Sequence, residues 1–424
     1  MPIEHAAAVK LSEQYQQVRS LSEKLASKLQ NEDTIIQAMP DVSPPKWHLA
    51  HTTWFFERFI LKENDSSYVP FNPQFDYLFN SYYETIGSYH PRHSRGVLSR
   101  PSMDEIYEFR NHVDEAIIQL VNQFESQLPQ EIHDLIEIGL QHEQQHQELL
   151  LTDVKYNFSC TPLLPQFAEP KTFQLPQSNT ETTYINIEGG LVEIGYSGAG
   201  FSFDNERPRH KVWLEPYRLA SHPVTNGEYI SFIEAGGYEQ PEHWLSDGWA
   251  TVKKEKWKHP LYWRKTEDGW YTFTLTGEKK LSLDEPVCHI SFYEADAFAR
   301  WSGKRLPTEA EWEHAMASIP IDGNFAESEC YHPVVDHSEN LAPFKQVYGD
   351  VWEWTSSPYT SYPRSKPLEG ALGEYNAKFM CNQIVLRGGS CASSQSHIRP
   401  TYRNFFPADK RWQFSGLRLA EDQS

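Results

Sequence analysis

Two histidines one helical turn apart, His142 and His146, constrain this chain more than any other feature of its sequence. In an α-helix, residues four positions apart lie one above the other on the same face. Leu135, Ile138 and Leu149 fall on that face as well, so the stripe is apolar and is expected to face a core. Two imidazoles that project into a core at this spacing can hold one metal ion. The same spacing also fits two core histidines that only make hydrogen bonds.

The segment also has the His-Glu-x-x-His pattern of zinc peptidases, in which Glu143 would be the general base. The pattern alone therefore leaves two metal chemistries open. The choice between them depends on what the remaining chain supplies.

Length, charge and cysteine usage narrow the class of protein. The 424 residues allow two or three domains. The net charge is −20 and no run of five basic residues occurs, which argues against nucleic acid or an anionic membrane as a partner. The five cysteines include no CxxC pair, and the chain has neither a secretion signal at its start nor a run of 18 apolar residues. These features predict a soluble, cytoplasmic protein with reduced thiols.

The first part of the chain is predicted to be a helix bundle. Apolar spacing and proline boundaries indicate helices over residues 6–30, 47–60, 102–126 and 131–152. Ser102 and Glu105 have the spacing of a capping box at the start of the third helix. Bundles build metal sites in their core from side chains on facing helices.

The second of these helices offers a third metal ligand. His48 and His51 lie three positions apart, and either could join His142 and His146. For each of the two, the alternative is a helix histidine bonded to a backbone group or a carboxylate.

Residues 65–101 are predicted to be a long loop, because prolines and glycines punctuate them. The loop is rich in tyrosine and phenylalanine and carries Arg92 and Arg95, so it is not disordered by composition. Tyrosines and arginines close to a metal would suit hydrogen bonding and carboxylate recognition. Aromatic packing and surface charge are the alternative for each residue taken singly.

The remaining chain is predicted to be a separate α+β domain with long loops. We place the helical domain at 1–165, a proline-rich linker at 166–182 and the second domain at 183–424. Short β-type runs occupy 184–187 and 191–195, and helices are expected at 226–235, 291–302 and 308–316.

Six motifs in the second domain resemble the formylglycine-generating-enzyme family, a variant of the C-type-lectin fold. They are His-Pro-Val-Thr-Asn-Gly-Glu-Tyr at 222–229, Pro-Val-Cys-His-Ile-Ser-Phe-Tyr-Glu-Ala at 286–295, Lys-Arg-Leu-Pro-Thr-Glu-Ala-Glu-Trp-Glu at 304–313, Gly-Asp-Val-Trp-Glu-Trp-Thr at 349–355, Leu-Arg-Gly-Gly-Ser at 386–390 and Ser-Gly-Leu-Arg at 415–418.

The first domain, with its histidine pattern of His51, His142 and His146, resembles the DinB-like four-helix bundle. This pairing of domains is similar to the ergothioneine-biosynthesis sulfoxide synthases, the EgtB family. The resemblance implies a non-haem Fe(II) enzyme that uses O₂ to join a cysteine thiol to the imidazole C2 of hercynine (Nα-trimethylhistidine), leaving a sulfoxide. The implied fold class is α+β in two domains, a DinB-like bundle followed by a C-type-lectin-like domain.

The resemblance assigns His51, His142 and His146 as iron ligands and leaves His48 structural. It also reduces Glu143, which lies about 100° round the helix from His142, to a role beside the ligands or on the surface.

For the substrates, the resemblance assigns Tyr82 and Tyr83 as active-site tyrosines that donate a hydrogen bond or proton to an oxygen-derived species. It also implies that Arg92 and Arg95 bind the carboxylate of the thiol substrate and that Gln145 bonds the imidazole of hercynine.

The resemblance further implies that Asn404 and Phe405 bind the trimethylammonium group of hercynine, with Phe405 offering a cation–π face. Relatives that use γ-glutamylcysteine carry an acid just after this pair and an arginine a few residues on, where this chain has Phe406 and Lys410. This departure favours plain cysteine as the sulfur donor. The family also allows γ-glutamylcysteine or a selenium donor that would give selenoneine.

Three other functions remain as alternatives. A formylglycine-generating-type oxidase needs two reactive cysteines, for which Cys381 and Cys391 are the candidates by position. The zinc-peptidase pattern is the second alternative, and a non-enzymatic lectin-like binding protein is the third.

Overall fold

The computed structural model describes residues 11–124, 127–171, 182–335 and 343–423. The chain divides into two compact units, Met1–Cys160 and Thr161–Ser424. Parts of three expected segments lie outside the described residues: the start of the helix at 6–30, the end of the helix at 102–126, and residues 172–181 of the linker at 166–182.

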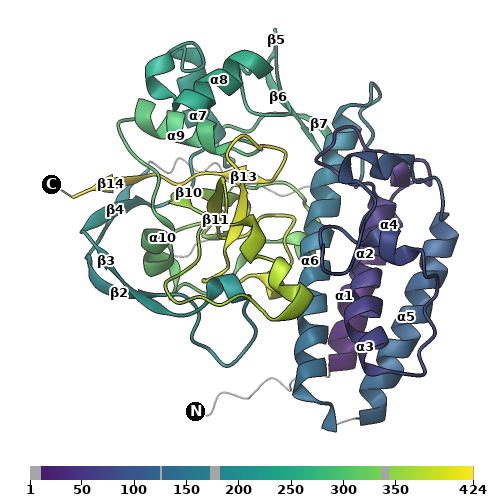
Figure 1. The fold of residues 1–424 in the computed structure, drawn as a ribbon. Coiled ribbons are helices and arrows are strands. Elements are labelled where there is room, and N and C mark those ends of the chain that lie inside the picture. The colour runs from purple at the N-terminus through teal and green to yellow at the C-terminus, as the bar shows by residue number, and fades with distance from the viewer. Residues whose placement is uncertain (1–10, 125–126, 172–181, 336–342, 424) are drawn as a thin grey trace. The chain divides into compact units, whose positions relative to one another are not determined.

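Four long helices lie side by side in the first unit (Figure 1). They are α1 (Leu11–Ala26), α2 (Pro45–Phe56), α5 (Met103–Phe124) and α6 (Gln130–Ser159). The helix expected at 47–60 ends at Phe56 and continues as a π-helical turn, Glu57–Leu61, followed by the short α3 (Lys62–Asn64). The segment expected to be a loop contains α4 (Phe75–Phe79) and a 3₁₀ turn, Arg92–Val97.

Helix α2 is buried along its whole length, so every side chain on it must be packed or hydrogen-bonded. It begins at Pro45, where a missing N–H costs nothing because the first turn has no intrahelical acceptor. Its last residue, Phe56, packs against Gly139 of α6, where a Cβ would lie 2.4 Å from the ring. Glycine at this position therefore allows α2 and α6 to approach closely.

The buried face of α6 is broader than its expected apolar stripe. Leu135 and Ile138 are only half-buried, whereas Ile132, Ile136 and Leu140 are buried. Both α1 and α2 pack on α6.

The start of α5 confirms the capping box. The Ser102 N–H donates to Glu105 Oε2 at 2.7 Å, and the Glu105 N–H donates to Ser102 Oγ at 3.2 Å. Two backbone donors that the helix leaves without an intrahelical acceptor are thereby satisfied.

Several small sheets make up the second unit. One contains β1 (Tyr184–Ile187), β4 (Tyr217–Ala220) and β14 (Ala420–Asp422) in the order β1-β4-β14. A second has the order β12-β11-β10-β13, formed by Asn404–Pro407, Gln383–Arg387, Trp352–Pro358 and Ser415–Gly416. The others pair β2 (Gly190–Ile194) with β3 (His210–Leu214), β5 (Trp263–Thr266) with β6 (Gly269–Thr274) and β7 (Gly277–Lys280), and β8 (Gly323–Asn324) with β9 (Tyr348–Gly349).

Helices α7 (Asn226–Glu234), α9 (Phe292–Trp301) and α10 (Glu309–Met316) lie where the sequence predicts them. Each begins with a capping box that belongs to one of the family motifs, formed by Thr225 and Glu228, Ser291 and Glu294, and Thr308 and Glu311. Helix α8 (Ser246–Glu255) was not expected, and only Gly248 and Val252 are buried in it.

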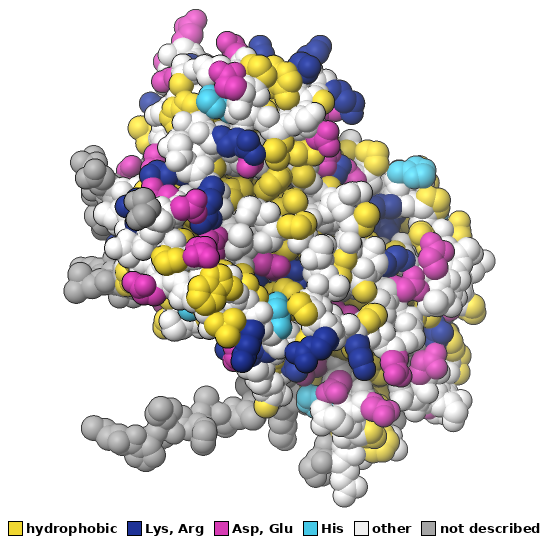
Figure 2. Space-filling view, turned by 60° about the vertical axis from the view of Figure 1, so that its left-hand side comes forward, with side chains coloured by type: hydrophobic (Ala, Val, Ile, Leu, Met, Phe, Trp, Pro, Cys, Tyr) yellow, Lys and Arg dark blue, Asp and Glu magenta, His cyan; other side chains and the backbone are white. Residues whose placement is uncertain are grey.

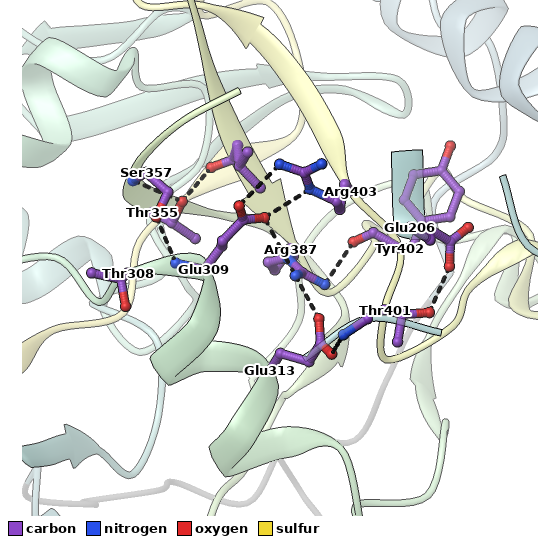
Figure 3. Close-up of polar contacts among 12 residues, drawn as sticks. Glu206, Thr308, Glu309, Glu313, Thr355, Ser357, Arg387, Thr401, Tyr402 and Arg403 are labelled. Atoms are coloured by element: carbon purple, nitrogen blue, oxygen red, sulfur yellow. Dashed lines mark hydrogen bonds and ion pairs between the residues drawn. The ribbon is translucent and has the colours of Figure 1, made fainter. Parts of the chain in front are cut away.

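Other motif residues meet in buried ion pairs. Arg387 Nη2 donates to Glu313 Oε2 at 2.7 Å, and Arg403 Nε donates to Glu309 Oε2 at 2.9 Å (Figure 3). The Arg418 guanidinium pairs with Glu353 at 2.8 Å. Because a buried charge without its partner is costly, these residues fix the loops of the second unit.

Acidic and basic side chains occur side by side over much of the face drawn in Figure 2. Among the described residues, no helix combines the length and the apolar character needed to cross a membrane.

Candidate metal centre

The structure brings together the three histidines assigned as ligands. His51 comes from α2, His142 and His146 come from α6, and one nitrogen of each lies within 4.8 Å of the others. His51 Nε2 and His142 Nε2 are 3.2 Å apart. For metal–nitrogen bonds of about 2.1 Å, two ligands at right angles lie about 3.0 Å apart, so the observed separation suits a shared ion.

The environment lowers the pKa values of all three rings, which favours the neutral form that binds a metal. Burial lowers the pKa of His142 to about 3. Burial and the neighbouring His142 lower the pKa values of His51 and His146 well below the ordinary histidine value.

The second ring nitrogen of two of these histidines has a defined partner. His51 Nδ1 lies 2.6 Å from the carbonyl oxygen of Phe79, the last residue of α4, so it must carry the proton and donate it. His146 Nδ1 lies 2.8 Å from His48 Nδ1. In both rings Nε2 is therefore the nitrogen available to a metal.

Two tryptophans on α2 hold the His51 ring between them. The Trp47 ring lies 4.5 Å from His51 at an interplanar angle of 12°, and the Trp54 ring lies 5.6 Å away at 18°. The guanidinium carbon of Arg95 lies 3.3 Å from the Trp47 ring centre. The signal in the sequence was the spacing of 47, 51 and 54, which places these residues on one helix face.

Arg95 and Arg92, the expected carboxylate binders, differ sharply in environment. Arg95 is 3% exposed, and its Nη1 and Nη2 donate to the hydroxyls of Ser43 and Ser81 at 2.8 and 3.1 Å. Arg92 is exposed and donates to the backbone oxygen of Asp41. Burial and the nearby Arg92 lower the pKa of Arg95 well below its ordinary value.

Tyr82 and Tyr83 stack on each other with ring centres 4.6 Å apart. Tyr83 is completely buried, and its ring lies 5.8 Å from Trp54, which packs on His51. Tyr82 is half-buried. The structure thus connects Tyr83 to the histidine cluster through one intervening ring.

The residues expected to bind hercynine belong to both units. Gln145 is half-buried on α6, next to His146. Asn404 and Phe405 lie on β12 of the second unit, where the Phe405 ring stacks on Tyr359 at 4.0 Å and 10°. Asn404 Oδ1 accepts from the Phe405 N–H at 2.9 Å.

The two residues that favour cysteine as donor also lie in the second unit. The Phe406 ring packs edge-on against Trp412 at 5.7 Å. Lys410 Nζ lies 3.4 Å from Asp409 Oδ2.

Glu143 points away from the histidines into a buried charge cluster. Its carboxylate accepts from Arg19 Nη1 at 2.8 Å, Ser22 Oγ at 2.6 Å and Arg110 Nη2 at 3.1 Å. Burial opposes its ionisation, but Arg19 and Arg110 outweigh burial and lower its pKa. The surface role considered for Glu143 is therefore wrong, and its three donors leave it unsuited to act as a peptidase base.

His48, to which the family resemblance gives no role at the metal, directly contacts the ligand His146. Besides His146, it contacts the carboxylate of Asp153 on α6, with Nε2 3.0 Å from Oδ2. Neither contact could be read from the sequence, because each joins residues about a hundred positions apart.

The cysteine pair required by the formylglycine alternative does not form a disulfide. Cys391 is completely buried, whereas Cys381 is exposed. The structure, which describes all five cysteines, contains no disulfide among them.

Comparison with known proteins agrees with this architecture. The family described as the DinB superfamily matches residues 14–150. The family described as the sulfatase-modifying factor enzyme 1-like domain matches residues 169–328 and 322–423. The expected fold class, a helical DinB domain followed by a C-type-lectin-like domain, is confirmed.

Three relatives narrow the class further. A hercynine oxygenase of Mycolicibacterium smegmatis is 31% identical over 91% of this chain and 92% of its own length. Ergothioneine biosynthesis protein 1 of Schizosaccharomyces pombe is 25% identical over 58% of this chain and 30% of its own length. A formylglycine-generating enzyme of Streptomyces coelicolor is 31% identical over 60% of this chain and 93% of its own length.

The fold and these relatives define an oxygen-dependent oxidoreductase with two domains. The match to hercynine oxygenase covers nine-tenths of the chain, including the helical domain that carries the histidines. The chain belongs to the hercynine oxygenase family, the EgtB type of ergothioneine biosynthesis.

The Glu143 cluster makes a prediction about stability and pH. Since the folded-state pKa of Glu143 is lowered, its contribution is present above the unfolded-state pKa and is lost as pH falls through the folded-state pKa. We expect Glu143→Gln to lower the free energy of unfolding by roughly 3 kcal/mol at pH 7. The deficit relative to wild type should shrink in acid, as measured by urea unfolding across pH.

Glu115→Gln, at an exposed position on α5, is the matched control and should unfold like wild type at every pH. A Glu143→Gln protein of wild-type stability that had lost activity would instead return Glu143 to a chemical role.

Proposed function

We propose that this protein is a non-haem Fe(II) sulfoxide synthase that joins cysteine to hercynine. O₂ is the oxidant: the thiol sulfur bonds to C2 of the imidazole, one oxygen atom becomes the sulfoxide oxygen, and the other leaves as water. The four electrons that O₂ accepts come in equal parts from forming the C–S bond and from oxidising the sulfur. The observation that carries the proposal is the cluster of three histidines on two helices in a member of the hercynine oxygenase family.

The histidine cluster fits iron. Imidazole nitrogens bind Fe(II) and Zn(II) alike, but zinc has no redox chemistry with which to reduce O₂. When bound, Fe(II) would supply the open coordination positions for the thiolate and O₂ and the electrons that activate O₂. Trp47, Trp54 and the Phe79 carbonyl fix the orientation of the His51 ligand.

Arg95 is our principal residue for the cysteine carboxylate. Its guanidinium is buried against Trp47, and among the described residues it makes no ion pair. Its Nε also has no hydrogen-bond partner there. A buried cation whose side-chain hydrogen bonds go only to two serine hydroxyls is costly, and a substrate carboxylate would reduce that cost. Arg92, exposed three residues earlier, contributes positive charge to the same anion.

Tyr82 and Tyr83 are assigned to the proton or hydrogen bond that the oxygen chemistry requires. The burial of Tyr83 beside Trp54 makes it the stronger candidate, because a hydroxyl shielded from water interacts more strongly with a developing charge. Tyr82 supports it by stacking.

Hercynine recognition is proposed for Gln145, Asn404 and Phe405. Gln145 follows from its position beside His146 and would bond the substrate imidazole. Asn404 and Phe405 are assigned to the trimethylammonium group, for which an aromatic face and an amide oxygen are suitable partners. The aromatic side chain of Phe406 offers no carboxylate for the amino group of a γ-glutamyl donor, which supports cysteine.

The function is tested on protein loaded anaerobically with Fe(II), then given hercynine, cysteine and air. We expect hercynine-dependent O₂ uptake and a product with the mass of hercynine plus cysteine plus one oxygen atom, less two hydrogens. His51→Ala should abolish both, because it removes a ligand and leaves two.

Two further donors in that assay decide the sulfur source. A far higher kcat/KM with γ-glutamylcysteine would keep the family chemistry and overturn cysteine as donor. Turnover only with a selenium donor would point to selenoneine synthesis, and no uptake with any donor would leave a lectin-like binding protein.

The role of Arg95 can be separated from general damage to the site. We expect Arg95→Gln to raise KM for cysteine roughly tenfold to a hundredfold, the value of a lost charge-assisted hydrogen bond. Cysteamine, which lacks the carboxylate, is the control substrate. Wild type and variant should use it equally, and a cysteamine rate that falls as far as the cysteine rate would count against carboxylate binding.

The tyrosines are tested by Tyr82→Phe, Tyr83→Phe and the double variant. Loss of an acid–base group typically costs at least about 100-fold in rate. We therefore expect the double variant to form sulfoxide at least that much more slowly and to divert turnover towards oxidation of the thiol alone. Unchanged kcat and product ratio in the double variant would remove both residues from the mechanism.

A further inference from the structure

A network of polar contacts extends from the histidine cluster to the backbone just before α2. His48 is 3% exposed and lies with its Nδ1 2.8 Å from His146 Nδ1. Its Nε2 lies 3.0 Å from Asp153 Oδ2. Asp153, 2% exposed on α6, also accepts from the Ser43 N–H at 2.7 Å, just before α2 begins.

Together with a bound metal, these contacts determine which ring nitrogen of His146 and of His48 carries the proton. A metal bound by His146 Nε2 requires that nitrogen to be unprotonated, so Nδ1 carries the proton of the neutral ring. That proton can only be donated to His48 Nδ1, which must then be the acceptor. His48 therefore carries its own proton on Nε2, where the Asp153 carboxylate accepts it. The two nitrogens of His146 and the two of His48 thus fit a single assignment of protons.

His48 is thereby excluded as a metal ligand, although the sequence left that possibility open. Both of its ring nitrogens are already in contact with partners, His146 and Asp153. The ring centres of His48 and His146 are 5.1 Å apart at 56°, so the hydrogen bond also limits rotation of the His146 ring.

We propose that His48 and Asp153 are positioning residues that fix the protonation form and the orientation of His146 as a metal ligand. The proposal rests on the proposed function, because it requires a metal at the histidine cluster. A carboxylate that accepts the distal proton of a ligating histidine raises the basicity of the metal-binding nitrogen, and here the effect passes through a second imidazole.

Asp153 also supports Arg95, the residue proposed to bind the carboxylate of cysteine. Asp153 holds the backbone of Ser43, and the Ser43 hydroxyl accepts from Arg95 Nη1 at 2.8 Å. Asp153 thus anchors two separate features, the His146 ligand through His48 and the Arg95 guanidinium through Ser43.

The test measures metal affinity rather than turnover. Fe(II) binding is followed anaerobically by competition with a chromophoric chelator in the full-length protein. We expect His48→Phe, which keeps a ring of similar size but has no nitrogen, to weaken Fe(II) binding roughly 10- to 100-fold. His48→Gln should recover most of the loss, because its amide oxygen can accept the proton from His146 Nδ1. Asp153→Asn should fall between, since it keeps an acceptor but loses the charge.

Asn157→Ala is the matched control. Asn157 lies one turn beyond Asp153 on α6, is equally buried, and accepts from the Ala38 N–H and donates to the Ile36 carbonyl, both at 2.9 Å. This variant should lose stability but bind Fe(II) as wild type does. Equal affinity in His48→Phe and wild type would overturn the proposal, as would a loss in Asn157→Ala as large as in His48→Phe.

A spectroscopic readout and the wild-type result complete the design. Co(II)-loaded His48→Phe should show shifted ligand-field bands relative to wild type, because the donor strength and orientation of one ligand change, and identical bands would count against the proposal. Wild-type protein that binds no metal would overturn the iron site itself, which distinguishes failure of the proposed function from failure of the positioning role.

Discussion

The close approach of α2 and α6 is the constraint on which the rest of the first unit depends. Gly139 allows the Phe56 ring to pack directly on the α6 backbone, and His51 thereby comes within reach of His142. With α2 buried along its whole length, each polar group on it needs a partner inside the protein. The histidine contacts meet part of that need, and Lys46 Nζ and Trp47 Nε1 donate to the carbonyl oxygens of Pro101 and Leu78.

The second unit reaches a fixed structure by a different route. Its sheets are short, and its long loops are tied by buried glutamate–arginine pairs and by capping boxes at three helices. The residues that make the family motifs recognisable in the sequence are largely those that form these ties. Such motifs therefore identify the fold and not the reaction. This is why formylglycine-generating enzymes and hercynine oxygenases, whose names indicate different chemistry, can share them.

Local patterns in the sequence predicted the local structure well. Helical spacing located α6 and its histidines, and the capping box of Ser102 and Glu105 located the start of α5. Helices α7, α9 and α10 were also placed correctly. Helix α8, of which only Gly248 and Val252 are buried, was missed, and α4 was missed inside a segment dominated by prolines. The position of Glu143 on the helix, about 100° from His142, already argued against a direct role at the metal. Its burial between Arg19 and Arg110 could not be predicted, because these two residues belong to α1 and α5.

Contacts between distant segments lie beyond such patterns. His51 was singled out because bundles place ligands on facing helices and because the family resemblance includes it. The link from His146 through His48 to Asp153 has no counterpart in spacing, since it exists only once α2 and α6 are packed together. The roles of the substrate residues stay predictions.

The positions of the ligands have a consequence for folding. His51 and His142 are 91 residues apart in the chain, so an ion bound by both acts as a removable cross-link that closes a long loop. Its binding free energy then adds to the stability of the folded bundle in proportion to the logarithm of free metal concentration, once that concentration exceeds the dissociation constant. The same ion that would serve the reaction would make the durability of the first unit depend on metal supply.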